Sequence, residues 1–110
     1  DTFAGQVHVL VNRFSYSNAV SVAAMIQDYG FGTIYGEQTR DMATTYGAME
    51  HFFLPNSEFK VGYPKAHIIR PNGETKTHPV TPDVSIPVPA VRGEKDVMLG
   101  ELIRLIQANL

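Results

Sequence analysis

The sequence predicts an α/β fold, and three observations carry this prediction. The β-branched run at 7–11 is typical of a strand buried in a parallel or mixed sheet. The apolar residues then change to helical spacing over 18–29, and a second strand is expected at 33–35. Two strands joined by one helix within so few residues favour a parallel crossover, which is the building unit of an α/β layer.

The helix expected at 18–29 has an apolar face and recognisable ends. Ser15 and Ser17 stand where an N-cap residue belongs, and Gly30 supplies the stop. Its apolar residues recur at i, i+3, i+4 and i+7, which predicts that one face carries Ala19, Val22, Ala23, Ile26 and Tyr29.

The middle of the chain predicts short strands joined by turns. Residues 38–47 show little periodicity and are expected to form a loop. Short apolar and aromatic runs bounded by Pro, Asn and Gly predict strands at 51–54, 59–63 and 66–70, with turns at 55–58 and 71–73.

The last third of the chain predicts an edge segment followed by a helix. Proline recurs through 79–89, so this segment is expected to cross the surface or to lie at a sheet edge. Asp96 is expected to cap a C-terminal helix whose apolar stripe contains Leu99, Leu102, Ile103 and Ile106.

Composition excludes several classes of function. A chain of 110 residues with 44% hydrophobic content is one domain at most. A net charge of −2 with dispersed basic residues argues against a nucleic-acid partner. No apolar run approaches the roughly 20 residues of a membrane span. Cysteine is absent, and the histidines are not at metal-ligand spacing, so we expect neither a metal site nor a cofactor.

Ser17 is the candidate residue for chemistry. A serine at the first turn of a helix lies beside free N–H groups and in a dipole that favours developing negative charge, so it can serve as a nucleophile. The alternative is an ordinary N-cap serine, which local features alone favour because such serines are common.

The order of motifs resembles peptidase family S41, the tail-specific or C-terminal processing serine proteases and their tricorn-like relatives. The resemblance rests on these stretches, in chain order: Leu10-Val11-Asn12, Ser15-Tyr16-Ser17-Asn18-Ala19-Val20, Asp28-Tyr29-Gly30, Tyr35-Gly36-Glu37-Gln38-Thr39, Leu54-Pro55-Asn56-Ser57, Pro71-Asn72-Gly73 and Pro82-Asp83-Val84.

The resemblance implies a fold and an activity. Residues 1–110 would be a single domain, the C-terminal portion of a ClpP/crotonase-like fold with a mixed sheet, a crossover helix and a C-terminal helix, and the upstream part of the catalytic domain would be absent. Ser17 would form an acyl-enzyme with a protein or peptide substrate, and the Asn18 N–H would belong to the oxyanion hole. The fragment alone would be inactive. An extracytoplasmic setting (periplasmic, secreted or lipoprotein-anchored) follows from the family, and the exposed sheet edges of such a fragment predict self-association.

Two positions bear on the identity of the general base. Processing proteases of the family continue Gly-Glu-x-Thr with x-Gly-Lys-Gly, and Met42 occupies the place of that lysine. Methionine accepts no proton, so a Ser–Lys dyad of that geometry is excluded. The tricorn-like branch implies a histidine upstream of this chain with a downstream acidic partner. Glu74 is the nearest candidate for that partner, although a solvated turn carboxylate is the simpler interpretation.

Two further residues have structural interpretations. His8 lies inside the strand that leads to Ser17 and is expected to be a packed or edge residue. Glu37 is expected to pair with backbone or with the loop after the strand.

A second function remains open beside proteolysis. Interphotoreceptor retinoid-binding modules resemble S41 proteases in fold and bind apolar ligands without cleaving peptides, and Met42 fits such a non-catalytic module for apolar ligands or peptides. A third alternative is an α/β domain in which Ser17 only caps its helix.

Overall fold

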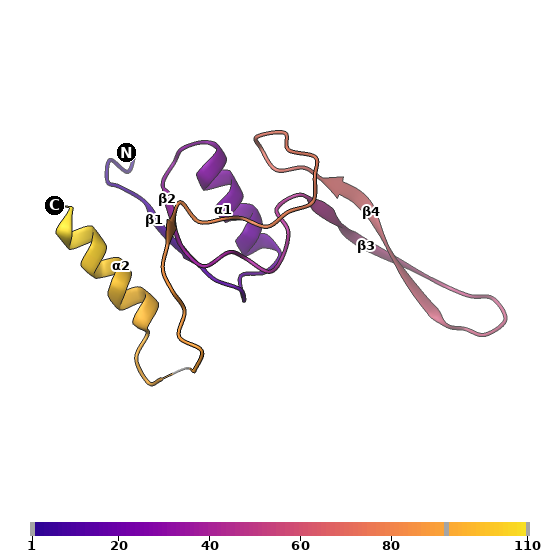
Figure 1. Ribbon diagram of the computed structural model, residues 1–110. Helices are drawn as coiled ribbons and strands as arrows, with labels where there is room; N and C mark the ends of the chain where they lie inside the picture. The colour runs from indigo at the N-terminus through magenta and orange to yellow at the C-terminus, as the bar shows by residue number, and fades with distance from the viewer. Residues whose placement is uncertain (1, 92, 110) are drawn as a thin grey trace.

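The computed structural model describes residues 2–91 and 93–109, which form two sheets and two helices (Figure 1). The elements in chain order are β1 (His8–Val11), α1 (Asn18–Asp28), β2 (Thr33–Gly36), β3 (Thr45–Phe53), β4 (Lys60–Ile68), β5 (Val84–Ser85) and α2 (Val97–Ala108). The first sheet has the order β1-β2-β5 and is parallel, whereas β3 and β4 form an antiparallel hairpin. The α/β prediction is confirmed, but the two kinds of pairing lie in separate sheets and not in one mixed sheet.

The parallel sheet is covered by α1 on one face and by α2 on the other (Figure 1). Successive residues of a strand point to opposite faces, so each strand contributes to two cores. Val11 and Ile34 pack with Val20 of α1, while Leu10 and Tyr35 pack on the α2 side. This double burial explains why β1 is a continuous apolar run, as expected for a strand in a parallel sheet.

The buried faces of the two helices differ from the predicted stripes. In α1, Ala23 is buried as expected, but Val20 is fully buried while Val22 is 47% exposed. In α2, Leu102 packs inward as predicted, but Met98 takes the place expected of Leu99, which is 46% exposed. Apolar residues occupy several sides of both helices, so spacing alone could not select the face that packs.

The hairpin is longer than the sequence indicated. The loop prediction for 38–47 is wrong at its end, because β3 begins at Thr45. The strands expected at 59–63 and 66–70 are one continuous strand, β4, which contains Pro64 opposite Met49. Proline is tolerated there because the outer edge of β4 pairs with no other described strand, so the ladder loses no hydrogen bond.

The hairpin extends away from the parallel sheet and gives the molecule its long axis of 64 Å (Figure 1). The turn predicted at 55–58 joins its strands, and the Leu54 N–H donates to the Phe59 carbonyl at 3.0 Å. Many of its large apolar side chains are more than a third exposed: Tyr46, Met49, Phe52, Phe53, Leu54, Phe59, Tyr63 and Ile68.

The proline-rich segment lies at a sheet edge, as predicted. β5 pairs with β2 through the register Tyr35 with Val84 and Gly36 with Ser85. The Asp83 N–H donates to the Ile34 carbonyl at 2.8 Å, which extends the same edge. Within the described part of the chain, neither helix combines the length and the apolar character that crossing a bilayer requires.

Candidate active site

The candidate site lies where β1 and β2 end. The strands are parallel neighbours, so the loops that follow them, 12–17 and 37–44, leave the same edge of the sheet. The first loop is a tight turn, since the Ser15 N–H donates to the Asn12 carbonyl at 2.9 Å and the Asn12 N–H donates to Ser15 Oγ at 3.1 Å. Ser15, expected near the N-cap, therefore shapes the turn before Ser17.

Glu37 joins the two loops. Its carboxylate accepts the Arg13 N–H at 3.1 Å and Arg13 Nε at 2.9 Å, and it also pairs with Arg13 Nη2. The hydrogen bonds from the Arg13 guanidinium hold the pKa of Glu37 below its ordinary value. The predicted pairing of Glu37 with backbone is confirmed by the Arg13 N–H, but the loop that it contacts is the one after β1, which precedes Ser17, and not the one after its own strand.

Ser17 has an uncommon backbone conformation, with φ +53° and ψ −120°. An ordinary N-cap residue has an extended backbone and a side-chain oxygen that accepts a helical N–H, but the Ser17 side chain makes no such hydrogen bond. A residue other than glycine in such a region carries strain of about 1–3 kcal/mol. An exposed serine on a sharp, strained turn from strand to helix is the geometry of a nucleophile elbow.

The hydrogen bonds around Ser17 leave one N–H group free at the start of α1. The Ser17 carbonyl accepts the N–H groups of Val20 at 3.0 Å and Ser21 at 3.1 Å, and the Ala19 N–H donates to the Tyr16 carbonyl at 3.1 Å. The Ser17 N–H donates to Asp41 Oδ2 at 2.6 Å. Among the described residues, none accepts a hydrogen bond from the Asn18 N–H. The Asn18 N–H is therefore a free donor at the start of α1, as first-turn N–H groups of a helix commonly are.

The loop that carries Asp41 is fixed from both sides. The Thr39 N–H donates to the Val80 carbonyl at 3.1 Å, and Thr39 Oγ1 accepts the Val80 N–H at 3.0 Å while donating to the Asp41 carbonyl at 2.9 Å. The backbone at Met42 then bridges to Pro79. Sequence reasoning missed Asp41. The available signal was its place in the stretch 40–43, where it replaces the first glycine of the family's Gly-Lys-Gly.

No general base reaches Ser17 within the part of the chain that the structure describes, since no hydrogen bond to Ser17 Oγ is formed there. His8 is the packed residue that the sequence predicted: its Nδ1 lies 3.2 Å from Tyr35 Oη at the opposite end of β1. The Glu74 carboxylate accepts the Lys76 N–H at 2.8 Å within its own turn. The same residues contain no cluster of His, Asp or Glu suited to a metal ion.

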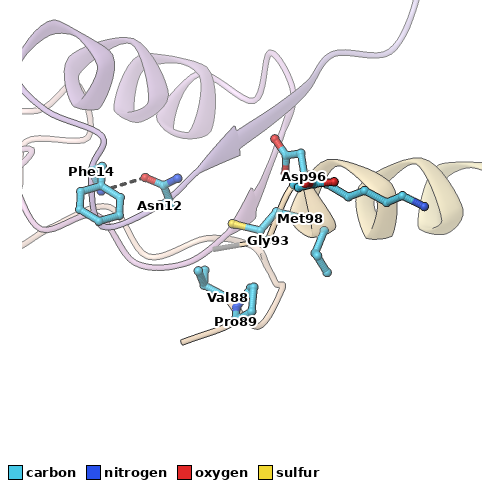
Figure 2. A pocket seen from close by; sticks show the side chains of 10 residues that line it. Asn12, Phe14, Val88, Pro89, Gly93, Asp96 and Met98 are labelled. Carbon is cyan, nitrogen blue, oxygen red and sulfur yellow. Dashed lines mark hydrogen bonds between the residues drawn. The ribbon is translucent and has the colours of Figure 1, made fainter. Parts of the chain in front are cut away.

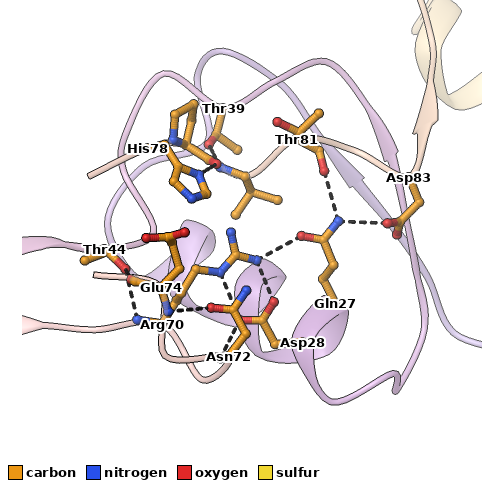
Figure 3. A network of polar contacts seen from close by, with 12 residues as sticks. Gln27, Asp28, Thr39, Thr44, Arg70, Asn72, Glu74, His78, Thr81 and Asp83 are labelled. Atoms are coloured by element: carbon orange, nitrogen blue, oxygen red, sulfur yellow. Dashed lines mark hydrogen bonds and ion pairs between the residues drawn. The ribbon is translucent and has the colours of Figure 1, made fainter. Parts of the chain in front are cut away.

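A buried ion pair holds the other end of α1 (Figure 3). Arg70 donates from Nε to Asp28 Oδ2 at 2.9 Å and from Nη2 to Asp28 Oδ1 at 2.6 Å, and both side chains are only 5% exposed. Arg70 Nη2 also donates to Gln27 Oε1 at 3.0 Å. The hydrogen bonds from Arg70, aided by the Asn72 N–H, lower the pKa of Asp28 against the opposing effect of burial.

Two further contacts connect this ion pair to the site loops and to the sheet. Thr44, at the end of the loop 37–44, accepts the Arg70 N–H at 3.2 Å and donates to the Glu74 carbonyl at 2.6 Å. Asp83 accepts Gln27 Nε2 at 2.8 Å (Figure 3). It also accepts the Ile34 N–H at 2.8 Å. Residues of the Pro-Asn-Gly turn and of the Pro-Asp stretch therefore support α1 and β2.

Two recesses flank the loop that ends at Ser17. One has a volume of about 460 Å³ and is lined by Arg13, Phe14, Ser15, Tyr16, Arg40 and Asp41. The other, of about 290 Å³, lies between Asn12 and the start of α2, with Val88, Pro89 and Met98 in its wall (Figure 2). Phe14 borders both recesses.

Comparison with known proteins assigns the family. A search of the curated proteins found no match to this chain. The sequence model of peptidase family S41 matches residues 1–86, which is more than half of the chain and contains both site loops. The chain belongs to peptidase family S41.

Proposed function

We propose that this chain carries the nucleophile of a serine endopeptidase of the S41 type. The observation that carries the proposal is the exposed Ser17 at φ +53°, followed by an Asn18 N–H with no acceptor among the described residues. An N-cap role does not explain the strained backbone of Ser17, although a free N–H on the first residue is common to helix starts. Acyl transfer requires both an accessible hydroxyl and a free donor for the oxyanion.

The reaction follows from these two groups. Ser17 Oγ attacks the scissile carbonyl carbon while a general base removes the hydroxyl proton, and the Asn18 N–H donates to the oxyanion that forms. The amine then leaves with a proton from the protonated base, and an ester on Ser17 remains. Water, deprotonated by the same base, attacks the ester and releases the acid.

The base comes from outside residues 1–110 in this proposal. Met42 accepts no proton. The His8 side chain is hydrogen-bonded to Tyr35 at the other end of β1, and the Glu74 carboxylate accepts a backbone N–H of its own turn. We therefore propose that the chain is the C-terminal part of an S41 catalytic domain on a ClpP/crotonase-like fold, and that it is inactive alone. The parallel sheet between two helices supports that fold.

The substrate would be a peptide segment in extended conformation. The two recesses beside the loop 12–17 supply places for side chains on either side of the scissile bond. From the family we also propose an extracytoplasmic location. The unpaired edges of the β3–β4 hairpin, with its exposed aromatic side chains, support self-association of the isolated chain.

Fluorophosphonate labelling of the complete protein that contains this chain tests the proposal. Mass spectrometry should locate the label on Ser17. Ser17→Ala should abolish labelling, and the matched control Ser21→Ala, one turn further along α1, should keep it. A folded protein without label at Ser17 would refute the serine mechanism.

A non-catalytic binding module is the second candidate, and Met42 in place of the family's lysine favours it. Exposed apolar side chains on the hairpin supply a surface for an apolar ligand or a peptide. Two results together would favour this candidate. The folded complete protein would take no fluorophosphonate label, and it would bind an apolar fluorescent probe with the same affinity as its Ser17→Ala variant.

A further inference from the structure

We infer that Asp41 is a positioning residue that fixes the strained backbone of Ser17 and so aims its hydroxyl; this inference rests on the proposed function. Its basis is the hydrogen bond of 2.6 Å from the Ser17 N–H to Asp41 Oδ2, formed across 24 residues of sequence.

The two peptide groups that flank the Ser17 Cα are both held. The group before it is fixed at its carbonyl by the Ala19 N–H and at its N–H by Asp41. The group after it is fixed at the Ser17 carbonyl by Val20 and Ser21. The first group sets φ and the second sets ψ. Asp41 is the one contact among these four that does not belong to the helix or its first turn.

The local sequence offers no substitute for Asp41. α1, which the structure describes throughout, has no acidic residue in its first turn, and Ser17 caps no N–H with its own side chain. A carboxylate at this position also interacts favourably with the positive end of the helix dipole. Without it, the described contacts that remain on the two peptide groups of Ser17 come only from α1 and its first turn. We expect them to hold φ +53° less firmly against the extended backbone of an ordinary N-cap residue.

Asp41 also determines which donor is left for the oxyanion. Because the carboxylate accepts the Ser17 N–H, that group is withdrawn from the substrate, and the Asn18 N–H stays free. The loop that supplies a lysine base in the processing branch of the family would here supply an acceptor for the nucleophile's own backbone.

The anchoring of Asp41 makes it suitable for this role. Thr39 Oγ1 donates to its carbonyl, and Thr39 is buried against Val80. The next residue, Met42, bridges to Pro79. The carboxylate therefore projects from a loop that is fixed on both sides, so its position constrains Ser17 rather than following it.

Three variants of the complete protein test the inference. Asp41→Ala removes the acceptor and should lower the fluorophosphonate labelling rate and the kcat for a peptide by about 100-fold, with KM little changed. Asp41→Asn keeps an acceptor oxygen and should stay within about tenfold of the wild type. Gln38→Ala, an exposed residue of the same loop, should label like the wild type. Equal losses in Asp41→Ala and Asp41→Asn, or a faster Asp41→Ala, would overturn the inference.

Hydrogen exchange at the Ser17 amide separates this inference from the proposed function. The amide should exchange slowly in the wild type and in Asp41→Asn, and fast in Asp41→Ala. If the wild type takes no label but shows this pattern, the serine mechanism fails while the positioning of Ser17 stands. Fast exchange of the Ser17 amide in the folded wild type would overturn the positioning role of Asp41, whatever the labelling result. This measurement uses the wild type alone, so it does not depend on whether Asp41→Ala folds.

Discussion

The two helices differ in the origin of the contacts that hold their ends. In α1, the first peptide is held by Asp41, 24 residues further along the chain, and Asp28 near the last turn is held by Arg70, 42 residues further. In α2, Asp96 accepts the Leu99 N–H at 3.0 Å from within the same turn, and Arg104 pairs with Glu101 across one turn. α1 is supported by tertiary contacts, and α2 by its own residues.

The difference shows which helix can hold a strained residue. Contacts within one turn form with the helix itself and fix only its relaxed conformation. Contacts from distant loops form with the whole fold, so their free energy can offset about 1–3 kcal/mol of local strain at Ser17. A relaxed cap at Asp96 and a strained turn at Ser17 are therefore consistent with a structural end in α2 and a functional end in α1.

The largest expected effect separates the two helix starts by activity. Ser17→Ala should reduce peptide hydrolysis by the complete protein on the order of 10⁴-fold or more, because it removes the hydroxyl proposed to form the acyl-enzyme. Asp96→Ala should leave kcat unchanged, since Asp96 caps α2 and lines only a recess proposed for a substrate side chain, so any effect is expected in KM. Steady-state kinetics on one peptide substrate compare them. Substantial activity in folded Ser17→Ala would contradict the nucleophile assignment.

The next effect compares the ion pairs of the two helices. Arg70→Ala should lower the free energy of unfolding by about 3–5 kcal/mol, because it leaves the Asp28 carboxylate buried without its partner. Arg104→Ala breaks an exposed pair and should cause no measurable change.

Urea denaturation of the complete protein measures both variants. The double variant Asp28→Leu/Arg70→Met should recover much of the loss, since no charge then remains buried. A small effect of Arg70→Ala alone would show that α1 does not depend on this contact.

Acid should weaken α1 through the same pair. The pKa of Asp28 is lowered in the folded state, so the unfolded state binds the proton at higher pH. The resulting stability is present above about pH 4 and is lost as the pH falls through the folded pKa. Unfolding curves between pH 3 and 7, an interval chosen to span the ordinary carboxyl pKa, should show a steeper acid limb in the wild type than in Asp28→Asn. Identical limbs would rule out this contribution.

Local signals explain how much of the fold could be predicted. The cap at Asp96 follows from residues within one turn, Gly30 marks the end of α1, and β1 and β2 follow from apolar runs. The start of α1 was predicted at the right residue, but Ser17 does not form the side-chain cap on which that prediction rested. The length of the hairpin did not follow, because β4 continues through Pro64 only where its outer edge lacks a partner. The buried faces of the helices depend on which sheet face each helix covers, and spacing within the helix does not contain that information.

In the candidate site, too, local signals predicted some residues and only tertiary contacts revealed the others. The order of motifs identified Ser17 and Asn18 as candidate site residues. The structure adds the backbone conformation of Ser17, which the motif does not contain. Asp41 and Arg70 were missed because their partners lie 24 and 42 residues away, and no periodicity marks such a pair. A serine before a helix is compatible with a relaxed cap or a strained turn, and only the tertiary contacts decide between them.

The smallest expected effect is the most direct comparison of the two helix starts. Asp96→Ala should lower the free energy of unfolding by about 1 kcal/mol, because the Leu99 N–H loses its acceptor. Asp96→Asn keeps an acceptor oxygen and should unfold with the free energy of the wild type. Ser17→Ala should change it by less than about 0.5 kcal/mol, since no cap hydrogen bond is lost.

Ser17→Gly should raise stability by about 1 kcal/mol relative to Ser17→Ala, because the relief of strain at φ +53° exceeds the added entropy of the unfolded chain. Thermal or urea unfolding of the four variants ranks them. If Ser17→Ala loses as much stability as Asp96→Ala and Ser17→Gly gains none, Ser17 acts as a second relaxed cap, and the strain that marks α1 as the functional helix is absent in solution.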